Sequence, residues 1–146
     1  MTAESAANLI ARLDLAPHPE GGWYRETWRA PSDTGAATGA RSPGTAILFL
    51  LEAGQASHWH RIDATELWLF QAGTALTLKT AADGTGPIIA TRLGPLAGDA
   101  PQHVVAPREW QAAQASADGW ALVACVVVPG FDFAGFELAD PGWAPG

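Results

Sequence analysis

The sequence predicts one all-β domain, a barrel or sandwich of short strands preceded by a single helix. Its 146 residues suit one domain with a sizeable core. Hydrophobic residues make up 48% of the chain and charged residues 16%, the balance of a globular protein and not of a disordered one. Sixteen glycines and eleven prolines divide the chain into short segments, and so many turns favour strands over helices.

The first expected element is a helix within residues 1–16. Four apolar residues spaced at i, i+3, i+4 and i+7 form one stripe: Ala6, Leu9, Ile10 and Leu13. Thr2 is placed to cap the start of this helix, and Pro17 ends it because the residue before a proline disfavours the helical conformation. A helix this short is marginal alone, so we expect it to pack on the rest of the domain.

Ten short β-type runs follow from Gly22 onward, each closed by glycine, proline or aspartate. They cover residues 23–29, 46–51, 57–61, 66–71, 75–80, 88–93, 103–105, 110–115, 121–128 and 133–138. Residues 31–43 are rich in Ser, Thr, Gly and Ala and are expected to form an exposed loop, and residues 141–146 a tail. Since no repeat or linker divides the chain, residues 1–146 are expected to form a single domain.

Composition excludes several classes of partner. The net charge is −7 and the eight basic residues are scattered singly, which disfavours nucleic acid and anionic membrane surfaces. The apolar runs are too short to span a bilayer, and the first residues lack the pattern of a signal peptide, so we expect a cytoplasmic protein. The single cysteine, Cys125, excludes an intrachain disulfide and is interpreted as a small buried hydrophobic residue.

Two histidines and a glutamate form a candidate site. His58 and His60 are two residues apart on an expected strand, so both side chains should leave the same face. Glu66 begins the next strand after a short turn, and an antiparallel hairpin would bring it back beside the histidines. Three interpretations stay open: a divalent transition-metal site, a metal-free polar pocket for general acid–base chemistry, and residues that form no site.

Aromatic residues near this site are candidates for contacting a ligand. If Glu66 points into the barrel, strand alternation sends Trp68 and Phe70 the same way. A pocket that contains Trp59 or Trp68, together with Phe70, offers flat apolar faces beside hydrogen-bonding groups, which suits a sugar ring or a planar heterocycle. Gln111 is a neutral amide that could orient a polar ligand. The alternative for the tryptophans is packing in the core or in a dimer interface.

The segment around His18 offers further candidates. His18 opens the sequence HPEGG, which predicts either a structural corner with glycines at positive φ or a loop over a pocket mouth. On the next run Arg25 and Glu26 alternate, so only one of them can face inward. An inward Arg25 would clamp a substrate carboxylate or phosphate, or pair with a neighbouring acid. Asp132, in the sequence PGFDF, is expected to stabilise a turn through its own backbone.

The spacing Gly54-x3-His58-x-His60-x5-Glu66-x6-Gly73 resembles the first motif of the cupin superfamily. In that superfamily two histidines and a glutamate hold a metal inside a small β-barrel. The resemblance therefore implies Ni, Zn, Mn or Fe on His58, His60 and Glu66.

The second cupin motif should supply a fourth ligand after a Pro-x-Gly turn, and residues 107–112 depart from it. Glu109 stands where the turn glycine is expected, and Gln111 or Ala112 stands where the histidine should be. A site without that imidazole is expected to hold metal weakly or not at all.

A narrower resemblance covers almost the whole chain. It is carried by the segments HPEGGWYRETWRA (18–30), SHWHRIDATELW (57–68), WQAA (110–113) and VVPGFDFAGFELAD (127–140), which are similar to DUF985, also called cupin superfamily 5. The resemblance implies a cupin barrel (a double-stranded β-helix, jelly-roll-like) with a short N-terminal helix, and a homodimer. The chain departs from this family at Leu69, where the family carries a histidine, so a role for that histidine cannot be carried over.

The resemblance implies a cupin that binds a small molecule, and it leaves the activity open. One hypothesis is an epimerase or isomerase acting on a sugar or related metabolite, with His60 as general base or ligand, Glu66 orienting it and Arg25 holding an anionic group. A second proton donor is missing from that scheme unless Tyr24 faces the pocket. The alternatives are a metabolite-binding cupin without catalysis and a structural dimer without an active pocket.

Overall fold

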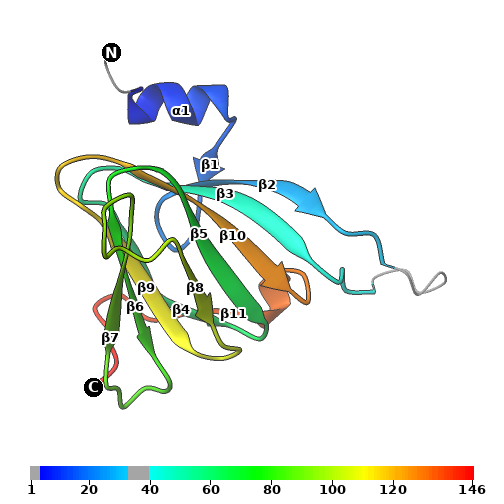
Figure 1. Ribbon diagram of the computed structural model, residues 1–146. Helices are drawn as coiled ribbons and strands as arrows, with labels where there is room; N and C mark the ends of the chain where they lie inside the picture. The colour runs from blue at the N-terminus through cyan, green and yellow to red at the C-terminus, as the bar shows by residue number, and fades with distance from the viewer. Residues whose placement is uncertain (1–3, 33–39) are drawn as a thin grey trace.

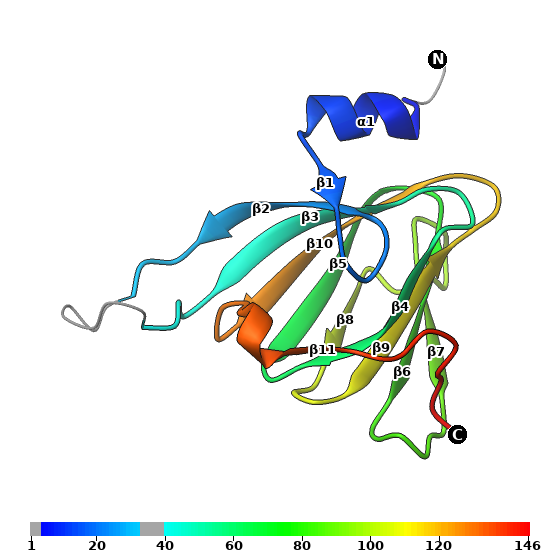
Figure 2. The ribbon, with the colours of Figure 1, turned by 180° about the vertical axis from the view of Figure 1, so that it is seen from behind.

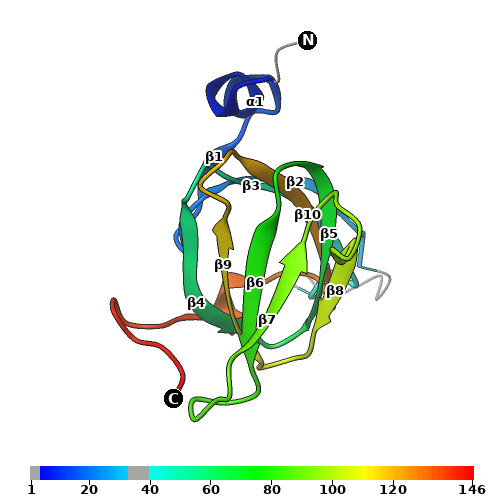
Figure 3. The ribbon, with the colours of Figure 1, turned by 60° about the vertical axis from the view of Figure 1, so that its left-hand side comes forward.

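The computed structural model describes residues 4–32 and 40–146. Two antiparallel sheets face each other and enclose the core (Figure 3). The six-stranded sheet has the order β1-β2-β3-β10-β5-β8, and the five-stranded sheet has the order β11-β4-β9-β6-β7. In chain order the elements are α1 (Ala6–Arg12), β1 (Ala16–Pro17), β2 (Trp23–Arg29), β3 (Thr45–Leu51), β4 (Ala56–Ile62), β5 (Thr65–Gly73), β6 (Leu76–Ala81), β7 (Ile89–Leu93), β8 (Gln102–Val105), β9 (Trp110–Ala115), β10 (Ala121–Val128), η1 (Phe133–Gly135) and β11 (Phe136–Leu138) (Figure 1). The expected all-β fold is confirmed.

The strands lie where the sequence predicts them, with two differences. The short strand β1 was not expected, and it pairs with the start of β2. The last run is a strand only over β11, because residues 133–135 form the 3₁₀ helix η1. Asp132 caps η1, since its side chain accepts a hydrogen bond from the backbone N–H of Ala134 at 3.0 Å. Asp132 therefore stabilises a turn, as expected.

The helix is shorter than residues 1–16. Ser5 caps α1, since its hydroxyl accepts a hydrogen bond from the backbone N–H of Asn8 at 3.1 Å. The expected cap, Thr2, lies outside the described residues. The helix ends early because Asp14 adopts a left-handed φ of 55°. No helix within the described ranges is long and apolar enough to cross a bilayer.

One end of the barrel is filled by apolar side chains from both sheets. This packed end consists of Phe49, Leu51, Trp68, Leu76, Leu78, Leu93, Val105, Ala113, Ala115, Ala121, Val123 and Cys125. The helix α1 covers the outer surface of the six-stranded sheet near this end (Figures 1 and 2), where Leu9 packs against Leu50 and Leu122. Cys125 is 2% exposed, in agreement with its interpretation as a buried hydrophobic residue.

The expected loop and tail are partly packed against the barrel. Within residues 31–43, positions 33–39 lie outside the described part of the chain, but Ser42 is buried and its hydroxyl donates to the carbonyl of Ala30 at 2.6 Å. An entirely exposed loop is therefore wrong at Ser42. In the tail, the ring of Trp143 lies 4.5 Å from that of Trp110. The tail thus covers part of the outer face of the five-stranded sheet, along which Figure 2 shows it in red.

Candidate functional site

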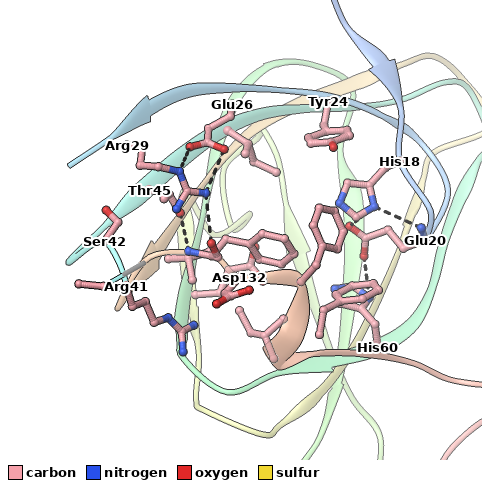
Figure 4. Close-up of a pocket in the computed structure, with 18 residues that line it drawn as sticks. His18, Glu20, Tyr24, Glu26, Arg29, Arg41, Ser42, Thr45, His60 and Asp132 are labelled. Atoms are coloured by element: carbon pink, nitrogen blue, oxygen red, sulfur yellow. Dashed lines mark hydrogen bonds and ion pairs between the residues drawn. The ribbon is translucent and has the colours of Figure 1, made fainter. Parts of the chain in front are cut away.

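The other end of the barrel holds a cavity of about 390 Å³ (Figure 4). It lies between the inner face of the six-stranded sheet, β4 and the segment that contains η1. Its lining comprises His18, Glu20, Tyr24, Glu26, Arg29, Ala40, Arg41, Ser42, Thr45, Ile47, His60, Ile62, Glu66, Val127, Phe131, Asp132, Phe133 and Phe136. Polar groups gather at two places, one around His60 and one around Arg29 and Arg41, with aromatic rings between them (Figure 4).

The HPEGG sequence forms a tight corner that carries its glutamate into the barrel. The backbone N–H of His18 donates to the carbonyl of Gly22 at 2.9 Å, and that of Gly21 donates to the carbonyl of His18 at 3.0 Å. Gly21 has a φ of +106°, and a Cβ there would lie 2.4 Å from the carbonyl oxygen of Ala56. The sequence offered a corner or a pocket mouth, and the structure combines them, because His18 and Glu20 both line the cavity.

Glu20 and His60 form a buried ion pair at the inner end of the cavity. Glu20 is 8% exposed and His60 is 3% exposed, and Nδ1 of His60 lies 2.6 Å from Oε2 of Glu20. The hydroxyl of Ser57 donates to the same oxygen at 3.0 Å. Burial raises the pKa of Glu20, but the positive charge and hydrogen bond of His60 outweigh it and hold that pKa below its usual value.

The hydrogen bonds of His60 define its protonation. Nδ1 faces two acceptors, the carboxylate of Glu20 and the carbonyl of His58 at 2.8 Å, so Nδ1 carries a hydrogen. Burial alone would lower the pKa of His60, but the charge and hydrogen bond of Glu20, with the charge of Glu66, raise it to about 9. His60 lines the cavity, so the positive charge of its imidazolium faces that space.

Glu66 faces the same cavity and is oriented by a chain of two hydrogen bonds. The indole N–H of Trp68 donates to Oε1 of Gln111 at 2.7 Å, and Nε2 of Gln111 donates to Oε1 of Glu66 at 2.8 Å. Because an indole only donates, it fixes which way the Gln111 amide points. Burial raises the pKa of Glu66 to about 7, the charge of His60 opposes that rise and the charge of Glu20 supports it.

His18 is a neutral imidazole among aromatic rings. Its Nδ1 accepts a hydrogen bond from the backbone N–H of Glu20 at 3.2 Å, so the 3.3 Å approach of the same nitrogen to the Glu20 carboxylate is not a charged pair. Burial lowers the pKa of His18, in agreement with this assignment. Its ring centroid lies 4.5 Å from that of Tyr24, edge to face. Tyr24 therefore lines the cavity, which answers the question of where it faces.

A bulge in β2 brings two charged side chains to the outer part of the cavity. Glu26 pairs with Ile47 and Trp28 with Ala46, so two steps along β2 oppose one step along β3. The extra residue reverses the alternation, and Arg29 joins Glu26 on the cavity side.

The bulge also explains where Arg25 lies. Arg25 is exposed and lies outside the cavity, because alternation from Glu26 places it on the opposite face. The prediction that Arg25 faces inward is wrong: Glu26 faces the cavity, and Arg29 and Arg41 line the cavity as well.

The expectation that His58 and His60 share a face is wrong. Between Ser57 and His60, three steps along β4 oppose two along β9, which marks a second bulge. His60 therefore faces the cavity, and Nε2 of His58 lies instead 2.9 Å from the carbonyl oxygen of Asp140.

The expected hairpin is also wrong. Strands β4 and β5 belong to different sheets, so Glu66 reaches His60 across the barrel and not along a ladder. The chain crosses from one sheet to the other within the short turn between these strands, which is why the sequence spacing resembled a hairpin.

The predicted ligand-contacting residues lie around the cavity without lining it. Trp59 packs on the outer face of its sheet with Trp110 and Ala112, because it alternates with His60. Trp68 and Gln111 are fully buried behind Glu66. Phe70 lies four residues beyond Glu66 along β5, roughly 13 Å at the usual strand rise, and this places it past the cavity.

The residues present do not fit the metal centre that the cupin motif implies. His58 points away, and Nδ1 of His60 is committed to the carboxylate of Glu20 and the carbonyl of His58. Gln111 uses its amide on Glu66 and Trp68. Within the described ranges, no group of three or more His, Cys, Asp or Glu side chains is arranged to hold an ion. These donors do not support a Ni, Zn, Mn or Fe centre on His58, His60 and Glu66.

Sequence reasoning missed Glu20, the carboxylate on which the inner end of the cavity depends. A glutamate directly before two glycines was the available signal, because such a turn can deliver a side chain inward. Arg41 was missed because it lies in the segment expected to be an exposed loop. Its guanidinium makes a bidentate pair with Asp63 at 2.9 and 2.8 Å.

Two facing antiparallel sheets with a polar cavity at one end of the barrel define a cupin. The chain belongs to the family described as Cupin superfamily (DUF985), whose model matches residues 7–139. A structural-genomics protein from Shewanella oneidensis is 36% identical, with a TM-score of 0.85 over 94% of this chain and 86% of that chain. A hypothetical protein from Leishmania major is 30% identical, with a TM-score of 0.81 over 93% of this chain and 88% of that chain.

More distant similarity extends to a variant of oxalate decarboxylase from Bacillus subtilis. It is 15% identical, with a TM-score of 0.63 over 87% of this chain and 31% of that chain. At this level of identity the likeness shows the fold alone. No functionally curated protein matches the chain.

Proposed function

We propose that this cupin is an enzyme that binds a small polar metabolite in the cavity and moves a proton next to a carbonyl group, as an isomerase or epimerase does. The observation that supports this most is that Glu66 and His60 both line the cavity and that the charge of each shifts the pKa of the other. Glu66 has a pKa of about 7, so near neutral pH it can both take and return a proton. His60 stays charged beside it, with a pKa of about 9.

Each group has a role in the proposed step. The ionised carboxylate of Glu66 removes the proton from the carbon beside the substrate carbonyl. The electrons of that C–H bond move into a new carbon–carbon double bond, and negative charge develops on the carbonyl oxygen. Nε2–H of His60 donates a hydrogen bond to this oxygen, and Glu20 keeps His60 protonated. Return of the proton to the former carbonyl carbon, with transfer of the adjacent hydroxyl proton to the former carbonyl oxygen, gives an isomer. Delivery of a proton to the opposite face of the carbon that lost it gives an epimer.

The scheme based on the sequence lacked a second proton donor. The hydroxyl of Tyr24 is a candidate for it, because Tyr24 lines the cavity. Tyr24 lies on β2 against His18, in the same six-stranded sheet as Glu66 on β5, with β3 and β10 between them. Epimerisation requires a proton donor separate from the base, and Tyr24 is the candidate for that donor.

Deuterium exchange tests the proposal without knowledge of the product. The protein is incubated in D₂O with a panel of aldoses, ketoses and their derivatives, and incorporation of deuterium beside the carbonyl is followed by NMR. We expect exchange with at least one compound, and a loss of about 100-fold or more in Glu66→Gln, because an amide cannot accept the proton. Arg25→Ala, a change outside the cavity, is the matched control and should exchange at the wild-type rate.

The same experiment separates catalysis from simple binding. A compound that binds in the cavity with no exchange in any member of the panel would favour the non-catalytic metabolite-binding cupin. Equal exchange by the wild type and Glu66→Gln would contradict the role given to Glu66.

A further inference from the structure

The cations of the cavity are already neutralised by carboxylates. From this we infer that the substrate is an uncharged polyhydroxylated carbonyl compound, a free sugar or close derivative, and not a phosphorylated or nucleotide-linked one. The inference rests on the proposed function and narrows its substrate class. It follows from the partners of three cations that line the described part of the cavity: Arg29, Arg41 and His60.

Arg29 is committed to protein groups. Its Nε donates to Oε1 of Glu26 at 2.6 Å, and its Nη2 donates to Oε2 of Glu26 at 3.1 Å and to the carbonyl of Phe131 at 3.1 Å. This is the bidentate arrangement in which an arginine binds a carboxylate or phosphate most strongly. The β2 bulge makes it possible, since it places both Glu26 and Arg29 on the cavity side.

Arg41 is committed in the same way. Its two terminal nitrogens donate to the two carboxylate oxygens of Asp63 at 2.9 and 2.8 Å, and its Nε donates to the carbonyl of Gly130 at 2.7 Å. The pKa of Asp63 is lowered, chiefly by its hydrogen bond with Arg41, so this pair is charged on both sides at neutral pH. A phosphate at Arg41 would have to displace a carboxylate that already fits.

His60 is the third cation, and Glu20 neutralises it at 2.6 Å. Two further carboxyl groups, those of Asp132 and Glu66, line the cavity, and neither has an arginine among its hydrogen-bond partners. Acidic groups therefore outnumber basic ones around the space. A phosphate ester would add up to two negative charges beside them, and sites that bind phosphate instead offer unpaired cations or convergent backbone N–H groups.

What the cavity does offer suits a polyol. A hydroxyl group both donates and accepts, so it can bridge a carboxylate and a guanidinium that are already paired with each other. The carboxylates of Glu26 and Asp132 stand beside Arg29 and Arg41 in the outer part of the cavity (Figure 4). Between the two polar regions, the rings of Phe131, Phe133 and Phe136 provide faces for the C–H side of a sugar.

Matched pairs of ligands test the inference. A panel of ketoses and aldoses, such as fructose, is compared by isothermal titration calorimetry with the phosphate monoesters of the same sugars, such as fructose 6-phosphate. We expect at least one free sugar to bind and its phosphate to bind at least about tenfold more weakly. Tighter binding by the phosphate of any pair, or binding by no free sugar in the panel, would overturn the inference.

A variant that removes the charge of Glu26 tests whether pairing of the arginines with carboxylates is what disfavours phosphate. Glu26→Gln frees Arg29 and removes one hydroxyl acceptor, so the affinity for the phosphate should rise at least about threefold relative to the affinity for the free sugar. Glu137→Gln is the matched control, since Glu137 pairs with Arg61 on the surface outside the cavity, and it should change neither. An unchanged preference in Glu26→Gln would contradict the charge argument.

The binding and deuterium-exchange experiments distinguish a failure of this inference from a failure of the proposed function. A free sugar that binds without deuterium exchange leaves this inference standing and contradicts the proposed function. A sugar phosphate that binds more tightly than its free sugar and undergoes deuterium exchange contradicts this inference and leaves the proposed function standing.

Discussion

The two ends of the barrel are built on the same strands and differ in what they bury. On β5, Trp68 packs into the apolar end, while Glu66, two residues earlier, faces the cavity. At the packed end, burial of apolar surface contributes about 25 cal/mol per Å², a non-directional term spread over many side chains. At the cavity end, stability depends on single partners such as Glu20, whose loss leaves a charge buried alone. The cavity end is therefore the part of the barrel whose stability depends on pH and on individual charged partners.

The largest predicted effect comes from Glu20→Ala. It leaves the imidazolium of His60 buried without its partner, so we expect a loss of about 4 kcal/mol in the free energy of unfolding and a fall in the pKa of His60. Urea denaturation and NMR titration of His60 measure the two changes.

Leu78→Ala at the packed end is the matched comparison for this prediction. Leu78 is fully buried, and its truncation should cost about 3 kcal/mol while leaving the His60 titration unchanged. If Glu20→Ala costs less than about 1 kcal/mol, the contrast between the ends does not hold.

The second prediction is a loss of stability at alkaline pH. The pKa of His60 is raised above its unfolded value to about 9, so its contribution is fully present below pH 6.5 and is lost as the pH rises through 9. Glu66 acts in the same direction between pH 4.5 and 7, because its pKa is raised to about 7. We expect the free energy of unfolding to fall by about 4 kcal/mol between pH 6 and pH 9.5, about 3 of it from His60 and about 1 from Glu66.

Urea denaturation across this range checks that prediction, with His60→Gln as the comparison. The variant should lose most of the decline above pH 7. A wild-type stability that is constant or increasing over the same range would show that His60 is not held as a cation.

The third and smallest predicted effect concerns Gln111, whose hydrogen bonds join Trp68 at the packed end to Glu66 in the cavity. Gln111→Leu leaves the indole N–H of Trp68 and Oε1 of Glu66 without partners, which should cost about 2 kcal/mol and raise the pKa of Glu66 further. Unfolding measurements and carboxyl NMR provide the readouts. The control is Gln114→Leu on the same strand, where the amide is exposed, and it should stay within about 0.5 kcal/mol of the wild type.

Much of the fold followed from local sequence patterns. Turn residues and short β-type runs placed the strands to within a few residues, and alternation from Glu66 correctly sent Trp68 inward. These features depend on neighbours along the chain, which a sequence displays directly. The pairing of β4 with β9 and not with β5 depends on long-range contacts, and no residue in the turn between them signals that crossing.

The site was harder to predict because two bulges reverse strand alternation. The bulge in β4 turns the side chains of His58 and His60 to different faces. The bulge in β2 places Arg29 on the cavity side, where regular alternation from Glu26 would place Trp28. A bulge adds a residue to one strand and requires no particular residue type. The sequence therefore gives no sign of it, and the facing predicted from alternation is wrong beyond it. Glu20 was missed for a different reason: its position depends on the backbone path of a glycine corner and not on any strand.

The cavity depends on one segment of the chain that the packed end does not use. Its walls come from residues 18–29, from β4 and β5, and from the late segment that holds Phe131, Phe133 and Phe136. The packed end draws on strands up to β10, all of which precede that segment. Loss of that segment would therefore remove one wall of the cavity while leaving every residue of the packed end in place.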